Sequence, residues 1–338
     1  MKKILLIPVF AFFVLVGKGQ QRPHYTQYIL NNYILNPALS GIENYTDVKL
    51  SARDQWVGLN GAPKTCYFSI HGPIGKKDYK TTATSFNTPG ENPRGKSYWE
   101  DYTASDPHHG IGLAVISDKT GLYQHFTADV SYAYHIGISP RTNIAAGFSG
   151  GFTQVSYDRA KATPVDPNDP AIGNSSASIH RVVPDLNAGI WIYSADYFFG
   201  VSAQQVIPEK VDFGNANTGF NLIPHYFATI GYRFLLNEDI NAIPSVMMKF
   251  ISDAPTKTQF DINVKLQYHD KLWAGGSYRL DDGYAAMVGI NINNFFNVGY
   301  SYDLTKTKLN TVSSGTHEIV LGFLLGNRYS DSCPRNVW

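Results

Sequence analysis

Apolar and polar residues alternate strictly along several stretches of the chain. In the stretch 258–268, every second residue from Phe260 onward is apolar, and the residues between are polar or charged. A period of two over about ten residues is typical of a β-strand with one apolar and one polar face. About nine to eleven tilted residues also suffice for a strand to cross a bilayer. Because a soluble β-sandwich shows the same alternation, the pattern alone predicts strands without placing them in a membrane.

The alternation recurs along the chain and predicts about fourteen strands separated by turn-forming residues such as Asp281-Asp282-Gly283. There is neither a helical period nor an alternation of strands with helices, so the predicted fold class is all-β. The predicted strands are 45–54, 64–71, 110–117, 123–138, 143–157, 184–194, 197–204, 225–235, 240–251, 258–268, 271–280, 284–292, 295–304 and 316–325.

Residues 1–19 have the three regions of a secretory signal peptide. Lys2-Lys3 precedes an apolar run from Ile4 to Val16, and Gly17-Lys18-Gly19 follows it. We expect cleavage after Gly19. The apolar run is too short for a spanning helix, and the later sequence has no run of about twenty apolar residues. The mature protein is therefore expected to be periplasmic, secreted, or a β-barrel in the outer membrane.

Composition favours the barrel. Charged residues make up 16% of the chain, against about 25% in soluble globular domains, and the 22 Tyr, 19 Phe and 30 Gly fit lipid-facing strands with aromatic girdles. A net charge of +1 argues against nucleic acid as a partner. Cys66 and Cys333 are the two cysteines, and their spacing leaves open whether they pair. We therefore predict a transmembrane antiparallel β-barrel of the outer membrane.

The connections between predicted strands alternate between long and short, as expected when short turns face the periplasm and long loops face outside. With fourteen strands, the polar stretch 75–109 falls on the periplasmic side, so it is either a periplasmic insertion or contains a further strand pair. The predicted parts of the chain are a signal peptide (1–19), an N-terminal segment that plugs the lumen (20–43), the barrel (44–326, with the insertion 75–109) and a C-terminal tail (327–338).

The polar faces of the predicted strands carry charges of both signs. Such a mixture favours a lumen plugged by salt-linked side chains over an ion-selective ring. The residues expected to face inward are Asp129, His135, Asp185, Asn187, Arg233, Lys249, Asp261, Lys265, Arg279, Asp303 and Glu318.

Short motifs in the expected order over nearly the whole mature chain resemble the PorP/SprF family of the type IX secretion and gliding apparatus of Bacteroidetes. The resemblance implies an outer-membrane barrel that accompanies export of large surface adhesins, or one that links the secretion machinery to its periplasmic ring. About thirty extra residues before Gly110 depart from the family pattern. The motifs are Tyr25-Thr26-Gln27-Tyr28, Leu35-Asn36-Pro37-Ala38-Leu39-Ser40-Gly41, Arg53-Asp54-Gln55-Trp56-Val57-Gly58, Gly61-Ala62-Pro63, Ser69-Ile70-His71-Gly72-Pro73-Ile74, Ser131-Tyr132-Ala133-Tyr134-His135, Ser301-Tyr302-Asp303, Gly315-Thr316-His317-Glu318-Ile319 and Cys333-Pro334-Arg335.

Several motif residues are candidates for plug or partner contacts. Asn36 before Pro37 is restricted to extended or turn geometry, so this segment is either an ordinary turn before the first strand or part of the plug. Trp56 fits an interfacial aromatic belt, and Arg53 is expected to pair with a lumen carboxylate. The full set of candidates is Tyr28, Asn36, Pro37, Arg53, Trp56, His71, His317 and Glu318.

Neither a catalytic nor a cofactor site is expected. His108 and His109 lie in the predicted polar insertion, where adjacent loop histidines lack a defined metal geometry. Ser131 and His135 are about 13 Å apart along one strand face, too far for a nucleophile and its base. We therefore expect a non-enzymatic protein without metal or cofactor.

The leading hypothesis is an outer-membrane component that assists type IX export or surface attachment of an adhesin. Its expected partners are that adhesin, other secretion-system proteins and outer-membrane lipid. A cargo-specific role is preferred because a thirty-residue departure is easier to accommodate in one of several paralogues than in a shared component. The alternatives are a transporter of small hydrophobic solutes, a linker to the periplasmic ring, and a simple porin.

Overall fold

The computed structural model describes most of the chain outside its two ends and a few connections. The predicted signal peptide, most of the insertion 75–109, nearly all of the predicted tail and Cys333 lie outside the described residues. The described residues are 26–76, 102–158, 178–211, 220–252, 258–269, 271–293 and 295–327.

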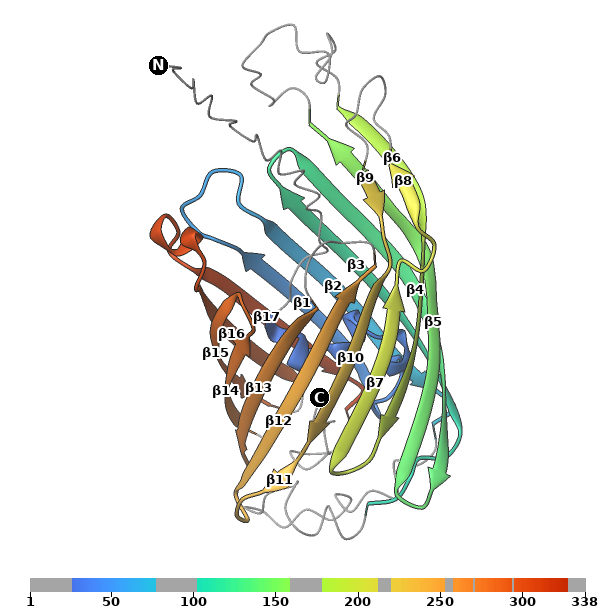
Figure 1. Ribbon diagram of the computed structural model, residues 1–338. Helices are drawn as coiled ribbons and strands as arrows, with labels where there is room; N and C mark the ends of the chain where they lie inside the picture. Colours follow the sequence, from blue (N-terminus) through green and yellow to red (C-terminus); the bar gives the residue numbers. More distant parts are fainter. Residues whose placement is uncertain are drawn as a thin grey trace, which may run out of the picture.

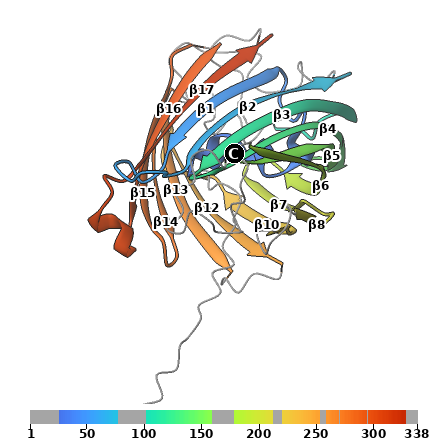
Figure 2. The same ribbon diagram turned by 90° about the horizontal axis from the view of Figure 1, so that it is seen from above.

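Fourteen strands form one closed antiparallel barrel (Figures 1 and 2). Each strand pairs with its neighbours in chain order, β10 with β12 closes the ring on one side, and the first strand pairs with the last. The fourteen are β1 (Thr46–Asp54), β2 (Lys64–Ile74), β3 (His108–Thr120), β4 (Tyr123–Ser139), β5 (Thr142–Tyr157), β6 (Ile179–Tyr193), β7 (Tyr197–Gln204), β10 (His225–Tyr232), β12 (Ile240–Ile251), β13 (Gln259–Tyr268), β14 (Leu272–Arg279), β15 (Gly283–Asn291), β16 (Phe296–Thr305) and β17 (Thr316–Leu325).

The prediction of an all-β antiparallel barrel with about fourteen strands is confirmed, and each predicted strand is present. Two strand starts differ by more than one residue, and the ends of β2, β3 and β10 each differ by three. β3 begins at His108, inside the stretch expected to be a polar loop, and β6 begins at Ile179, five positions before the predicted start at Pro184. Pro184 lies within β6; proline lacks a ladder donor but is tolerated in a strand where its nitrogen faces no partner.

Three short strands and several 3₁₀ turns accompany the barrel. β8 (Glu209–Val211) and β9 (Phe220–Leu222) form a separate hairpin, and β11 (Phe234–Leu235) extends the wall beside β12. Val211 packs on Val155 and Val183, so the hairpin rests on the inner face of β5 and β6. Three residues are too few to show a period of two, which is why these strands were not predicted.

The two faces of the wall differ as the alternation predicted. On the outer face Val130 is 64% exposed and Val264 is 46% exposed, whereas the neighbouring inward Asn263 is 1% exposed. Within the described residues, no helix is long and apolar enough to cross a membrane. An apolar outer face around a polar interior is the arrangement required of a barrel in lipid, because closure leaves no unpaired strand edge in the hydrocarbon.

The connections distinguish the two ends of the barrel. Most connections at one end are short turns, such as 140–141 and 236–239. Most at the other end are longer, such as 158–178 and 306–315, although 121–122 and 280–282 there are short. By the loop-length rule, the end with the longer connections is the outer end and the other is the periplasmic end. Since β2 pairs directly with β3, the connection 75–107 leaves from the periplasmic end.

Val264→Arg tests the face assignment. Val264 lies midway along β13 on the outer face, so arginine there should lower the free energy of unfolding by about 2–4 kcal/mol. Phe260→Arg, on the same face near the outer end of the strand, should cost only about 0–1 kcal/mol for its charge. Urea unfolding in lipid vesicles measures both, and equal losses would contradict a membrane midplane at Val264.

Candidate functional site

The N-terminal segment 26–43 lies inside the barrel (blue in Figure 1). It consists of the 3₁₀ turns η1 (Thr26–Leu30), η2 (Asn32–Ile34) and η3 (Pro37–Leu39). From Tyr28 to Glu43 every residue is buried except the half-buried Leu30. Apolar side chains of the segment pack on inward residues of the wall, among them Trp273 and Met287. Closure of the lumen to solutes by this segment stays a prediction.

Asn36 has two roles at the centre of the segment. Its Oδ1 accepts a hydrogen bond from the Ala38 N–H at 3.0 Å, which caps η3 in front of Pro37. Its Nδ2 donates to the carbonyl oxygens of Ile190 and Val201 at 3.1 and 3.2 Å. The side chain therefore shapes the turn and also attaches the segment to β6 and β7. The turn that the motif predicts is present, and the role of the segment as a plug stays a prediction.

Hydrogen bonds fix other parts of the segment to opposite sides of the wall. Asn31 Nδ2 donates to Ser69 Oγ of β2 at 2.9 Å. On β7, Ser202 Oγ donates to the Leu35 carbonyl at 2.7 Å and Gln204 Nε2 to the Ile34 carbonyl at 2.8 Å. Contacts on β2 and β7 hold the segment across the lumen.

Two tyrosines of the segment extend this set of contacts. The Tyr28 hydroxyl accepts from Asn263 Nδ2 of β13, and the Tyr33 hydroxyl lies 2.6 Å from Ser131 Oγ of β4. Burial raises the pKa of Tyr33 to about 12 and raises that of Tyr28 further, so both hydroxyls keep their protons. Tyr28 was a predicted contact residue. Tyr33 was not, because no motif distinguishes it from other aromatic residues.

Glycines on the inner wall make room for the segment. A Cβ at Gly110 would lie 1.7 Å from the Ser40 carbonyl oxygen, and a Cβ at Gly147 would lie 2.6 Å from Ala38 Cα. At Gly189 it would lie 2.1 Å from Asn36 Oδ1. Gly110 on β3 and Gly147 on β5 thus let backbone approach backbone, and Gly189 on β6 makes room for the Asn36 side chain.

Three histidines surround the turn at Ser40 and Gly41. The Gly41 N–H donates to His71 Nδ1 at 3.3 Å, and His135 Nε2 lies 2.8 Å from the Ser40 carbonyl oxygen. His108 Nε2 lies 3.2 Å from the Gly41 carbonyl oxygen, and its ring stacks on that of His135 with centroids 4.5 Å apart. His71, a predicted contact residue, thus touches the segment.

The expectation that His108 and His109 lie in a polar loop is wrong, since both belong to β3. His108 points inward and is buried, whereas His109 is on the outer face with its Nδ1 2.7 Å from the Tyr132 hydroxyl. Alternation therefore separates the two neighbours onto opposite faces of the wall. Among the described residues, no group of three or more His, Cys, Asp or Glu side chains is placed to hold a metal ion.

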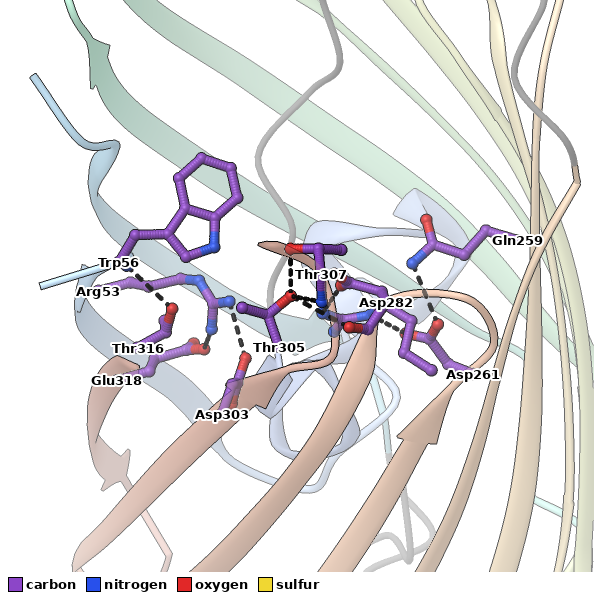
Figure 3. A network of polar contacts seen from close by, with 11 residues as sticks. Arg53, Trp56, Gln259, Asp261, Asp282, Asp303, Thr305, Thr307, Thr316 and Glu318 are labelled. Atoms are coloured by element: carbon purple, nitrogen blue, oxygen red, sulfur yellow. Dashed lines mark hydrogen bonds and ion pairs between the residues drawn. The ribbon is translucent and has the colours of Figure 1, made fainter. Parts of the chain in front are cut away.

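Two arginines form ion pairs in the outer half of the lumen (Figure 3). Arg53 Nη1 lies 2.9 Å from Glu318 Oε2, and Arg53 Nη2 lies 2.8 Å from Asp303 Oδ2. Arg279 pairs with Asp261 at 3.3 Å and with Asp282 at 2.9 Å. The predicted pairing of Arg53 with a lumen carboxylate is confirmed, and all eleven residues expected to face inward are buried.

Trp56 and His317 lie away from the segment. Trp56 is in the β1–β2 connection with φ +51°, and its N–H donates to Thr316 Oγ1 at 3.1 Å (Figure 3). His317 faces outward, and its Nδ1 lies 2.7 Å from the Tyr300 hydroxyl. The structure therefore brings Tyr28, Asn36, Pro37 and His71 together in one contact region. It places Arg53 with Glu318 in a second region, and leaves His317 on the outer wall.

A closed antiparallel ring with an apolar outer face and a polar, charged interior defines an integral β-barrel of the outer-membrane type. The sequence profile described as "Type IX secretion system membrane protein PorP/SprF" matches residues 17–323. The chain belongs to this family, which confirms the resemblance found in its motifs. Among curated proteins, none matches the chain.

Solved structures of outer-membrane barrels are similar to the chain at low identity. The toluene transporter TodX of Pseudomonas putida is 9% identical, with 90% of this chain and 94% of that chain covered and a TM-score of 0.47. The CymD monoaromatic hydrocarbon channel is 11% identical, with 88% of this chain and 91% of that chain covered and a TM-score of 0.47. A Pseudomonas aeruginosa FadL homologue is 10% identical, with 90% of this chain and 94% of that chain covered and a TM-score of 0.45.

Proposed function

We propose that this membrane component of type IX secretion is a non-enzymatic, non-conducting partner protein that assists export or surface attachment of an adhesin-type cargo. The observation that carries the proposal is the occupied lumen. Residues 28–42 are buried, except for the half-buried Leu30, and the segment is hydrogen-bonded to β2, β4, β6, β7 and β13. A barrel with this interior offers its loops and its outer wall to a protein, rather than a passage to a solute.

Packing inside the described part of the lumen supports a non-conducting barrel. The space beside Tyr28 measures about 10 Å³ and the space beside Arg53 about 20 Å³. Each holds about one water molecule. A small hydrophobic solute needs far more room than either of these two spaces offers. Purified protein in planar bilayers should therefore show no steady conductance.

Deleting the gene tests the role in secretion. A cargo-specific partner should be required for surface display of one adhesin, because its loops and wall recognise that cargo while the other export routes stay intact. Whole-cell immunofluorescence and mass spectrometry of the culture medium measure display and general secretion. We expect one adhesin to fall to background with other secretion unchanged.

The same strain separates the alternatives. Failure of all type IX cargo together would favour the linker to the periplasmic ring, in which case the connection 75–107 at the periplasmic end should crosslink to ring proteins. Unchanged display of every adhesin, with wild-type secretion, would contradict both roles and would bring the transporter hypothesis forward. Re-expression of the wild-type chain is the control.

A further inference from the structure

Four polar side chains form one row on the outer face of β3 to β6. In the strand register Lys119 pairs with Gln124, Gln124 with Ser156, and Ser156 with His180. Lys119, Gln124 and His180 are exposed, and the positions beside them in sequence, such as Asp118 and Val155, point inward and are buried. The four side chains therefore project together from the outside of the wall.

Below this row the outward positions become apolar. Two rows nearer the periplasmic end, the outward set is Val115, Ala128, Phe152 and Pro184, and the next is Leu113, Val130, Gly150 and Leu186. The change from apolar to polar marks the upper limit of hydrocarbon contact on this side of the barrel. The polar row thus lies where lipid headgroups of the outer leaflet meet the protein.

A hollow of about 360 Å³ is formed at the row. Ser156 Oγ lies 2.7 Å from His180 Nδ1, and Gln154 Nε2 lies 3.4 Å from Ser156 Oγ. Lys119 and Phe126 are among the residues that line the hollow. The volume falls within the range of about 300–1,000 Å³ usual for small-molecule sites.

We propose that this hollow binds the phosphorylated headgroup of a glycolipid of the outer leaflet. Its side chains supply an ammonium group, two amides, three hydroxyls and an imidazole. Each of these groups can donate a hydrogen bond to a phosphate or sugar oxygen. Asp158 is the one carboxylate in the lining. Phe126 in the lining and the apolar rows toward the periplasmic end continue the site toward the membrane, so the ligand is an acylated phosphate rather than a free one.

The opposite wall offers a matched residue without such a hollow. Lys306 also lies at the outer end of the barrel, but its Nζ is 4.5 Å from the centre of the Tyr284 ring and 5.0 Å from that of Tyr278. It stacks on aromatic faces and does not line the hollow. Lys306→Ala and Lys119→Ala therefore remove the same charge from the same end of the protein, and only Lys119→Ala changes the site.

The test measures binding of full-length purified protein in detergent to deep-rough lipopolysaccharide and to the same lipopolysaccharide stripped of its phosphates. The wild type should prefer the phosphorylated form. Lys119→Ala should weaken that binding about fivefold, which corresponds to about 1 kcal/mol. The double variant Lys119→Ala, His180→Ala should bind the phosphorylated and dephosphorylated forms equally. Lys306→Ala should stay within about twofold of the wild type.

Heat-modifiable migration in gels verifies that each variant is a folded barrel. Lys119→Gln repeats the binding measurement with an uncharged side chain that is longer than that of alanine. Equal weakening by Lys119→Ala and Lys306→Ala would overturn the proposal, since general surface charge would then explain binding. Equal affinity of the wild type for the phosphorylated and dephosphorylated probes would overturn it as well.

Discussion

Replacing Gly147 with valine should displace the middle of the segment 26–43 and open the barrel to ions. A Cβ at this position would lie 2.6 Å from both Cα and N of Ala38, and backbone atoms on both sides cannot give way. We expect a loss of about 3 kcal/mol in the free energy of unfolding, the upper end of overpacking costs. In planar bilayers a steady conductance should appear that the wild type lacks.

Gly150→Val is the matched control, because it adds the same side chain to the same strand on the lipid face. There the nearest atom to a Cβ is Leu186 Cδ2 at 3.3 Å, the end of a flexible side chain. We expect a change in stability within about 0.5 kcal/mol and no conductance. Absence of conductance in Gly147→Val, with the barrel folded and destabilised, would show that residues 26–43 do not close the lumen.

Removing the charge of Arg53 should destabilise the barrel by about 3–5 kcal/mol. The guanidinium pairs with Asp303 and Glu318, and the Glu318 side chain has no solvent exposure. Arg53→Met leaves these two carboxylates buried without the cation that lies between them. Urea unfolding in lipid vesicles at neutral pH measures the loss.

Two further variants identify the cause of that loss. The triple variant Arg53→Met, Asp303→Leu, Glu318→Leu removes all three charges and should recover most of the stability, since buried ion groups are replaced by apolar residues at little net cost. Lys64→Ala breaks the exposed pair with Asp54 at 3.1 Å and should cost at most about 1 kcal/mol. A loss in Arg53→Met no larger than in Lys64→Ala would mean that the lumen network is hydrated.

The sequence predicts the wall of this barrel well because each strand lies between two different surroundings. Residues such as Val264 and Asn263 alternate between lipid and lumen, and the alternation is visible without knowing which strands are neighbours. The same reasoning predicts the inward charges, including Arg53 and Glu318. Their pairing needed only the assumption that lumen charges of opposite sign meet.

The contacts of the N-terminal segment were beyond sequence reasoning because they depend on register between distant parts of the chain. Asn36 contacts the carbonyl of Val201, 165 positions away. The sequence does carry one sign of these contacts, the glycines at inward positions of β3, β5 and β6. An interior filled by side chains of the wall would place larger residues there. No comparable sign in the sequence indicates that Tyr33 contacts the wall or that His135, although expected to face inward, contacts the segment.

Arg53 and Glu318 are also direct partners in the register of β1 with β17, so this ion pair lies on the seam where the two ends of the wall meet. A slip of one residue at the seam would turn every side chain of one strand to the other face. If β1 slipped, Arg53 would leave Asp303 and Glu318 in the lumen without their cation, at a cost of about 3–5 kcal/mol. The ion pair therefore favours the native register when the ring closes. Alignments of β1 and β17 that are shifted by one residue would separate the guanidinium from the carboxylate.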